Sequence, residues 1–579
     1  MKNSKNKCLF LVLLVLLVTG VNAQDEKGYF DAPYTRYEGD QGALSNGASI
    51  VSMSYNHEDL QSEASEKVCL NMTKTGAQVE WEMKKPADGL VVRFSIPDGE
   101  TAELDVFAGD KKVGTLKLTT HWSWEYLWKN GNQNNVGVRN DNPKMRFDEV
   151  RLKLPSPIAA EGKLKLVTKS GNVHLDFAEM ELVPAALKPG ADDVVYSGDG
   201  SDLQSFIDNK GGGKTVFVPE GKYNVNRELY FGVAGTTLKG AGMWYSQINF
   251  TSEQYLKGGL RANAKDISFM DLYLTTDRNS RTSSYKGING VFTSGSVIKN
   301  MWVEHFECGA WIAQYNIGSI KKADGFTASN CRFRNNYADG INLCKGTSNS
   351  VVEHCNFRNN GDDDMAIWCA NDMECVNNTF RYNTSENTWR SSGCAIYGGK
   401  NNKAHHLIIK DNLEAGIKVS NAYPGVGFNA EGMHEFSDIK IIRCGTFNDL
   451  FYHMVGAIDL MVVSVAGNEV RNVKFSNVYI KDACDAGIFI NGANGKGFYN
   501  LSFENVTVNG TGREFPYNNA EEKDWSRGFG LLFASNPAGN GTYCKLKYKN
   551  IGGSALVEED VYGKGSFEWT QVNDCKPVK

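Results

Sequence analysis

The sequence has few of the patterns that mark helical, membrane or nucleic-acid-binding proteins. Long runs with the 3.6-residue apolar period of an α-helix are almost absent from its 579 residues. Its 62 lysines and arginines are outnumbered by 67 aspartates and glutamates, and no basic stripe is present, which disfavours nucleic acid or anionic lipid as a partner. No segment after residue 23 is long and apolar enough to cross a bilayer. The 60 glycines and many asparagines favour a turn-rich β protein that does not insert into a membrane.

The cysteines also lack a metal-binding pattern. No CxxC pair and no Cys/His cluster with zinc spacing occurs, which excludes a structural zinc site of the usual kinds. Cys331 and Cys355 lie one sequence repeat apart, and they are either bridged or buried as free thiols. Cys544 and Cys575 form the most plausible disulfide near the C-terminus.

The first 23 residues have the pattern of a secretory signal peptide. Three lysines precede an apolar run at 8–18, which is too short for a membrane span. Small residues at 21–23 predict cleavage after Ala23, so we expect a mature protein that is secreted or periplasmic.

The mature chain divides into two regions by its apolar patterning. Residues 24–186 alternate apolar and polar in short bursts such as 163–166, with Gly, Asp and Asn turns between them, which predicts an antiparallel β-sandwich. Pro and Gly at 184–193 indicate a linker. From about residue 260 a small residue followed by alternating apolar positions recurs at spacings of 22 to 41 residues. Stacked repeats with loops of variable length are typical of a solenoid, which we place at 187–579.

The segment 198–225 resembles the entry to a right-handed parallel β-helix of the pectate-lyase superfamily. That resemblance implies a short helix at about 203–208 that caps the first coil, because an open end would expose unpaired backbone groups. The expected fold is therefore all-β, a right-handed parallel β-helix preceded by a β-sandwich.

Two stretches, 330–344 and 354–369, repeat each other with an offset of 24 residues and carry acidic residues. Asp339 aligns with Asp363, so on neighbouring coils they should stand about 4.8 Å apart. Asp362 adds a third carboxylate, and crowding of three should raise at least one pKa. A protonated acid beside ionised bases is what hydrolysis of a glycosidic bond requires. We interpret Asp364 as a structural residue in a solvated turn.

Aromatic residues on the same or neighbouring coils are candidates for stacking on sugar rings. In the sandwich region Trp122, Trp124 or Trp128 could do the same, although core packing explains any one of them equally well. The candidates near the aspartates are Trp311, Tyr337, Trp368, Trp389 and Tyr397.

The motifs ADGINLC (338–344), TSNSVVEHC (347–355) and GDDD (361–364) resemble the central motif of glycoside hydrolase family 87. That family contains α-1,3-glucanases and mycodextranases, which cut nigeran. The resemblance implies an inverting enzyme whose three essential acids are Asp339, Asp362 and Asp363. In that design one Asp is the acid and two flank the attacking water. From the stacking we hypothesise that Asp362 protonates the leaving oxygen, whereas Asp339 and Asp363 share and activate the water. An α-glucan substrate, no catalytic cofactor and a monomer are expected.

Residues 37–50 and 175–183 resemble the opening and closing strands of carbohydrate-binding modules of families 6 and 35. In such modules a Glu near the start and an Asp near the end often bind a structural calcium ion, and oxygen ligands suit calcium. The matching residues here are Glu38 and Asp176, although two solvated acids would give the same pattern.

Four alternatives stay open. A family 28-like polygalacturonase is disfavoured because the chain has no Gly-His-Gly motif and no evident basic subsite for uronates. A dextranase-like activity on α-1,6 linkages would use the same scaffold and acids, and a lyase would need a base such as Lys418 or Arg390. A non-catalytic carbohydrate-binding β-helix would not need three crowded carboxylates.

Overall fold

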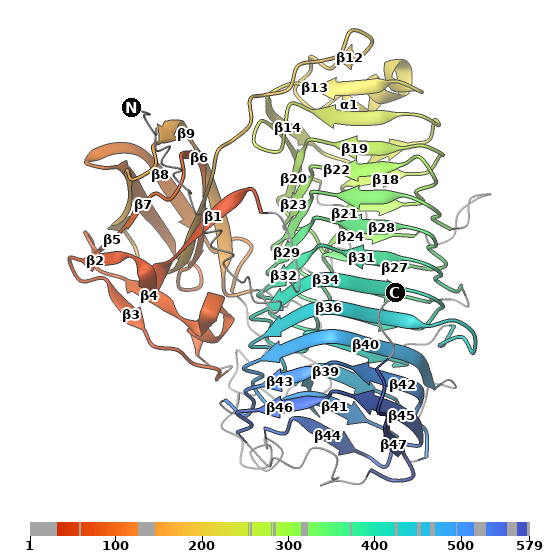
Figure 1. The fold of residues 1–579 in the computed structure, drawn as a ribbon. Coiled ribbons are helices and arrows are strands. Elements are labelled where there is room, and N and C mark those ends of the chain that lie inside the picture. The colour runs from red at the N-terminus through yellow and green to blue at the C-terminus, as the bar shows by residue number, and fades with distance from the viewer. Residues whose placement is uncertain are drawn as a thin grey trace, which may run out of the picture.

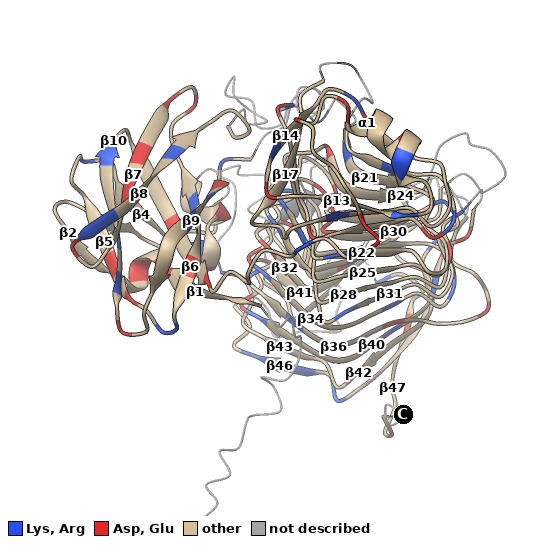
Figure 2. Cartoon of the chain, turned by 90° about the horizontal axis from the view of Figure 1, so that it is seen from above, with Lys and Arg blue, Asp and Glu red and all other residues tan. Residues whose placement is uncertain are grey.

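The computed structural model describes residues 32–56, 59–124, 145–252, 254, 258–279, 281, 285–313, 322–370, 373–422, 426–448, 453–463, 469–493, 495–513, 528–552 and 564–575. A small β domain stands beside a tall stack of strands (Figure 1). Viewed from above, acidic and basic residues are scattered over both domains (Figure 2). Within the described residues, no helix is long and apolar enough to cross a membrane. The signal-peptide prediction, at 1–23, lies outside these residues.

The small domain is a sandwich of two antiparallel sheets, as the alternating pattern predicts. Alternate residues such as Leu164 and Leu166 point into one shared core and are fully buried. The first sheet has the order β3 (Ser49–Val51), β4 (Cys69–Met72), β11 (Val173–Glu181), β6 (Ala87–Ser95), β9 (Asp148–Ile158), with β1 (Tyr34–Glu38) paired to β11. The second has the order β2 (Ala43–Ser45), β5 (Gln78–Glu82), β10 (Lys163–Ser170), β7 (Thr101–Ala108), β8 (Lys111–Thr119). Short 3₁₀ turns lie at Gly39–Gln41, Leu60–Glu63 and Ser65–Lys67.

The large domain is a right-handed parallel β-helix whose coils supply strands to two long sheets. The first is β15 (Leu229–Phe231), β18 (Leu260–Ala262), β21 (Lys286–Gly290), β24 (Cys308–Ile312), β27 (Ile341–Cys344), β30 (Met365–Trp368), β33 (Cys394–Tyr397), β35 (Ile417–Ser420), β39 (Gly456–Met461), β41 (Ala486–Asn491), β44 (Leu531–Ala534). We call it the site sheet.

The second long sheet takes two strands from most coils and bends between them. Its members are β12 (Val194–Val195), β13 (Thr215–Val218), β14 (Gly221–Val225), β16 (Thr237–Gly240), β17 (Ser246–Phe250), β19 (Ser268–Met270), β20 (Tyr273–Thr276), β22 (Val297–Lys299), β23 (Trp302–Glu304), β25 (Thr327–Ser329), β26 (Arg332–Arg334), β28 (Val351–Glu353), β29 (Asn356–Arg358), β31 (Thr379–Arg381), β32 (Thr384–Glu386), β34 (Lys403–Lys410), β36 (His434–Ile442), β40 (Val470–Lys481), β42 (Phe498–Glu504), β43 (Thr507–Asn509), β45 (Gly539–Cys544), β46 (Lys547–Lys549) and β47 (Glu568–Gln571). A two-stranded hairpin joins β37 (Phe447–Asn448) and β38 (His453–Met454).

Left-handed residues turn the chain at the corners of each coil. On successive coils Asn330 and His354 end β25 and β28 with φ of 53° and 53°, and Asn335 and Asn359 end β26 and β29 with φ of 53° and 58°. Asparagine adopts this conformation more readily than most residues because its short side chain hydrogen-bonds locally. The corner side chains also connect coils, since the Asn359 amide donates to the Asn335 oxygen at 2.9 Å. This explains why the repeats are rich in asparagine.

The β-helix contains both the cap and the disulfide that the sequence predicts. The expected cap is present as α1 (Leu203–Phe206), which continues as one π-helical turn at Ile207–Gly211. The predicted disulfide between Cys544 and Cys575 is confirmed, with Cα atoms 5.6 Å apart. Cys331 and Cys355 are free, buried thiols, so the second of the two alternatives for that pair holds.

The two domains share a buried interface made of charged side chains. Arg358, at the end of β29, is fully buried, and its guanidinium donates to Glu149 at 2.5 Å and to Glu179 at 2.8 Å, both in the sandwich. Burial alone would raise the pKa of Glu179, but the arginines around it, Arg358 first, lower it to about 2. The further cross-domain pairs are Arg36–Glu386, Arg332–Glu181, Arg334–Glu149 and His305–Asp148.

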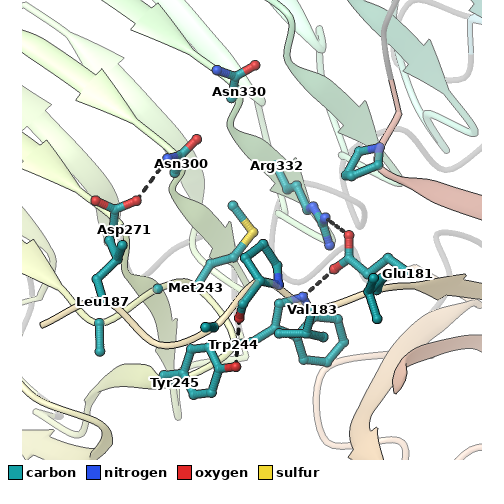
Figure 3. Close-up of a pocket in the computed structure, with 16 residues that line it drawn as sticks. Glu181, Val183, Leu187, Met243, Trp244, Tyr245, Asp271, Asn300, Asn330 and Arg332 are labelled. Carbon is teal, nitrogen blue, oxygen red and sulfur yellow. Dashed lines mark hydrogen bonds and ion pairs between the residues drawn. The ribbon is translucent and has the colours of Figure 1, made fainter. Parts of the chain in front are cut away.

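A cavity of about 380 Å³ lies where the linker crosses the β-helix (Figure 3). The linker is held there by two hydrogen bonds, from the Leu187 amide to the Ala241 carbonyl at 2.9 Å and from the Tyr245 hydroxyl to the Pro184 carbonyl at 2.7 Å. None of the residues that line this cavity belongs to the aspartate cluster, so the cavity is a feature of the domain junction.

Candidate active site

The β-helix register brings the three aspartates together. Ile341 of β27 pairs with Met365 of β30, so Asp339 and Asp363, two residues before each strand, stand on neighbouring coils as the repeat predicted. The Gly340 amide donates to the Asp363 carbonyl at 3.1 Å, which fixes this spacing. One carboxylate oxygen from each of Asp339, Asp362 and Asp363 lies within 4.8 Å of the others.

Asp363 is held by three donors. Its Oδ1 accepts from the Ser391 hydroxyl at 2.8 Å and the Ser392 amide at 3.1 Å, and its Oδ2 accepts from the Tyr397 hydroxyl at 2.9 Å. Burial and the Asp362 charge raise the pKa of Asp363 to about 6, while the donors oppose that rise. Asp363 is therefore ionised at neutral pH and gains a proton in mildly acidic solution.

Asp339 is the carboxyl most strongly favoured in its neutral form. It is 7 % exposed, and burial together with the charges of Asp362 and Asp363 raises its pKa well above the ordinary range. The Asn342 amide donates to its Oδ2 at 3.3 Å, a hydrogen bond too long to offset the crowding. The cluster thus carries at least one proton at neutral pH, as crowding predicted.

Asp362 has a different environment because an arginine reaches it. The Arg281 guanidinium forms an ion pair with Asp362 and donates to the Gly361 carbonyl at 3.1 Å. The Asp362 side chain is 27 % exposed, the most open of the three aspartates. Arg281 could not be predicted from the sequence, because it lies between β20 and β21, outside any motif.

The aspartates line a cavity of about 270 Å³ on the site sheet. Trp311 and Trp368 meet edge to face in its wall, with ring centroids 5.8 Å apart and planes at 74°. Tyr397 also lines it, so three of the five predicted aromatic residues are at the cavity. Glu307, Asn342 and Arg281 complete the polar lining and were not predicted. Tryptophan and tyrosine faces beside carboxylates suit a sugar, which has both C–H faces and hydroxyl groups.

Two of the predicted aromatic contacts are wrong. Tyr337 is fully buried, and its hydroxyl donates to the Trp122 carbonyl of the sandwich at 2.8 Å. Trp389 is 2 % exposed and packs with Met145 of the sandwich and Leu413. Both residues lie behind the site, because the sandwich covers that side of the coils.

Asp364 is a structural residue as expected, but it is not in a solvated turn. It is fully buried, and its oxygens bond the Asn360 amide at 2.7 Å and the Ser385 hydroxyl at 2.5 Å. Burial raises its pKa well above the ordinary range, which favours its neutral form.

The tryptophans of the sandwich fall at the domain interface or outside the described residues. Trp122 stacks on His305 of the β-helix with ring centroids 4.0 Å apart, and the Trp124 indole nitrogen is buried. Trp128 lies outside the described residues. Sugar stacking by Trp122 is therefore disfavoured, since its ring is engaged within the protein.

The calcium prediction stays a prediction that the contacts do not favour. Asp176 is buried against the Arg93 guanidinium, and both of its oxygens accept from the Ser65 amide at 3.0 Å. Glu38 accepts from the Ser65 hydroxyl at 3.0 Å, and burial raises its pKa to about 7. A cation at this place would have to displace a guanidinium. Among the described residues, the close group of three potential metal ligands is the aspartate cluster itself.

Known protein families match both domains of the chain. The family model of the α-1,3-glucanase catalytic domain D1 matches residues 31–183, and that of domain D2 matches residues 200–518. The crystal structure of the Agl-KA catalytic domain has a TM-score of 0.83 at 30% identity, with 94% of this chain and 99% of that chain covered. No curated protein matches the chain.

More distant structures share the fold. A family 87 α-1,3-glucanase catalytic domain in complex with nigerose has a TM-score of 0.80 at 22% identity, covering 94% of this chain and 99% of that chain. The catalytic unit of a thermostable family 87 α-1,3-glucanase from Streptomyces thermodiastaticus has a TM-score of 0.77 at 22% identity, covering 95% and 98%. Three further structures are of single aspartate-to-alanine variants, with two of those aspartates adjacent and the third 23 residues before them. The sandwich matches a domain that is named as part of the catalytic unit, and with the β-helix match this shows that the chain belongs to the α-1,3-glucanases of glycoside hydrolase family 87 and is a glycoside hydrolase that acts on α-glucan.

Proposed function

We propose that the protein is an exported enzyme that hydrolyses α-1,3-glucosidic linkages, in α-1,3-glucan or nigeran, through Asp339, Asp362 and Asp363. The observation that carries this proposal is the cluster of three carboxylate oxygens within 4.8 Å in a cavity lined by two tryptophans and a tyrosine. The spacing of these aspartates, 23 residues and then one, equals that of the three positions replaced in the related variants. The signal-like sequence at 1–23 supports export.

In the proposed reaction Asp362 is the general acid, because it is the most exposed of the three toward the cavity. When an incoming glucan separates Arg281 from Asp362, the proton that Asp339 favours can pass to Asp362, so that Asp339 becomes an ionised base and Asp362 becomes the acid. It then protonates the glycosidic oxygen, and the leaving sugar departs with that proton.

Asp339 and Asp363 bind and activate the attacking water in this scheme. Two hydrogen bonds of about 2.8 Å from one water reach oxygens about 4.6 Å apart, so a separation of up to 4.8 Å suits a shared water. Water attack on the face opposite the leaving group inverts the anomeric centre. The wider Asp362–Asp339 separation of about 6.5–9.5 Å expected for inversion is not met by the nearest oxygens in this structure. The stereochemical outcome therefore needs a direct measurement.

The activity is tested by incubating the purified protein with α-1,3-glucan, nigeran, dextran and polygalacturonate and separating the products by chromatography. Oligosaccharide products are expected from α-1,3-glucan or nigeran. Products from polygalacturonate alone would overturn the proposal. Proton NMR of the first product released should show the β anomer, as inversion requires. The α anomer as the first product would show that the enzyme retains the configuration.

The role of Asp362 is tested by Asp362→Asn. We expect kcat on glucan to fall by about 10²- to 10⁴-fold, with much of the loss restored on an aryl α-glucoside whose leaving group needs no proton. Asp363→Asn should not be restored in this way, because the water would still lack its base. Equal rescue of both variants would reject the assignment.

A further inference from the structure

Outward-facing residues of the site sheet form a continuous column that passes through the catalytic cavity. The strand register pairs Tyr230 with Arg261, Arg261 with Asn289, Asn289 with Trp311, and Trp311 with Asn342. Trp311 and Asn342 line the cavity, so the other three residues continue its floor toward the capped end. At about 4.8 Å per strand, the column from Tyr230 to Asn342 is about 19 Å long. The column starts on β15, and its next strands, β18, β21, β24 and β27, follow one another down the stack in Figure 1.

The column is open on one side of the cavity and closed on the other. Tyr230 is 39% exposed and Arg261, Asn289 and Trp311 are partly exposed, whereas Asn342 is nearly buried. Beyond it, the same column continues with residues that have almost no exposed surface: Ala366, Ala395, Lys418 and Asp459.

An ion pair marks the closed side. The Lys418 ammonium lies 2.8 Å from the Asp459 carboxylate, and both side chains are at most 2% exposed. Separating a buried pair leaves an uncompensated charge, which is costly, so a sugar does not displace it readily. A polymer that enters the cavity therefore has room to extend along the open side.

Tyr230 is held firmly at the far end of the open side. Gln204 of α1 bonds its backbone twice, donating to the carbonyl at 3.0 Å and accepting from the amide at 2.7 Å. The Asn263 amide donates to the phenolic oxygen at 2.5 Å. Gly232 lies against the ring, where a Cβ atom would come within 2.7 Å of it. A fixed, exposed aromatic ring loses little conformational entropy when it binds a ligand.

We propose that Tyr230 is a distal glucan-binding residue and that Arg261 and Asn289 lie along the path between it and the cavity. The polymer chain then runs parallel to the axis of the β-helix, with its longer part over the coils near the cap. This inference rests on the proposed function, because the ligand is the α-glucan that the aspartates cleave.

The test is Tyr230→Ala in the full chain, assayed on an α-1,3-linked series from the disaccharide to the octasaccharide. We expect kcat/KM for the octasaccharide to fall about 5- to 10-fold, the amount expected from one aromatic contact, while kcat/KM for the shortest cleaved substrate stays unchanged. Tyr499→Ala, on β42 of the other long sheet, is the matched control and should change neither value.

The possible outcomes separate this inference from the proposed function. An equal loss on short and long substrates, or no loss on the octasaccharide, would reject the distal site. An α-1,6-linked series is run in parallel, so the dependence on length is measured on whichever linkage the enzyme cleaves. Failure of the wild-type protein on every α-1,3-linked substrate would reject the proposed specificity and leave the length test to the α-1,6 series.

Discussion

The environment of single carboxyl groups decides how the cluster divides its charges. Asp363 receives three hydrogen bonds, Asp339 one long one, and Asp362 an arginine. Three acids of the same type therefore differ because their neighbours differ, which is how one site obtains both a proton donor and bases. Since Asp339 and Asp363 interact strongly within the cluster, their titrations are linked, and a change at one neighbour alters the pH dependence of the whole reaction.

Tyr397→Phe is predicted to move the acid limb of the kcat/KM profile to higher pH. The Tyr397 hydroxyl donates to Asp363 and stabilises its ionised form, so its removal raises the pKa of Asp363 above about 6. Because the base must be ionised, activity appears only as pH rises through this pKa. A hydrogen bond to a charged group contributes about 1.5 kcal/mol, or about one pH unit.

The measurement is kcat/KM on a soluble oligosaccharide between pH 4 and 8. Tyr245→Phe is the control, since its hydroxyl bonds the linker at Pro184, away from the cluster. A profile for Tyr397→Phe that keeps its shape and only loses height would show that Asp363 does not limit the acid side.

At the level of elements, the turn between β29 and β30 places the catalytic residues. Asn360 stacks under Asn336, with the Asn336 amide 2.9 Å from the Asn360 oxygen, and the Asn360 amide bonds Asp364 at the end of the turn. Asp362 and Asp363 lie between these two anchors. The turn is thus fixed from the interior of the coil while its middle faces the cavity.

Asp364 is predicted to tolerate asparagine but not alanine. As a neutral, buried acid it resembles an amide in shape and hydrogen bonding, so Asp364→Asn should change the free energy of unfolding by less than about 1 kcal/mol. Asp364→Ala leaves the Asn360 amide and Ser385 hydroxyl each short of a partner and should cost about 2–3 kcal/mol. Denaturant unfolding and kcat on glucan measure both effects. An alanine variant of normal stability that lacks activity would instead make Asp364 catalytic.

Part of this element could be predicted because the fold repeats. The 24-residue offset corresponds to one coil, so the stacking of Asp339 and Asp363 follows from the sequence alone. Arg281 comes from a non-repeating loop on an earlier coil, and repeat spacing says nothing about where such a loop folds back. Tyr337 and Trp389 were misassigned because the pattern of one coil does not show that a second domain covers one of its sides.

At the level of the whole molecule, the sandwich supports the catalytic coil from behind. Arg358 and Asn359 come directly before the turn with the aspartates, and the sandwich contacts both. The Asn359 amide donates to the Phe147 carbonyl at 2.7 Å, and Arg93 donates to the Asn359 oxygen at 2.8 Å. A separate sugar-binding module would not need such an interface, so the two domains are one structural unit.

Arg358→Met is predicted to destabilise the protein by about 3 kcal/mol, because the buried Glu149 and Glu179 lose the guanidinium that they share and keep only Arg334 and Arg36 as partners. The midpoint of denaturant unfolding measures this cost. Lys163→Met is the matched control, since its pair with Glu80 is exposed to solvent and should change the unfolding midpoint little.

Arg358→Lys retains the charge but not the forked geometry of the guanidinium. Its free energy of unfolding should therefore lie between those of the wild type and Arg358→Met. It should stay folded even if the methionine variant does not. Because Arg358 lies four residues before Asp362, the folded lysine variant should also lose kcat on glucan while its KM changes little. If both Arg358 variants lost as little stability as Lys163→Met and kept the wild-type kcat, the sandwich would not position the aspartates. A large loss of stability with normal kcat would confine its role to folding.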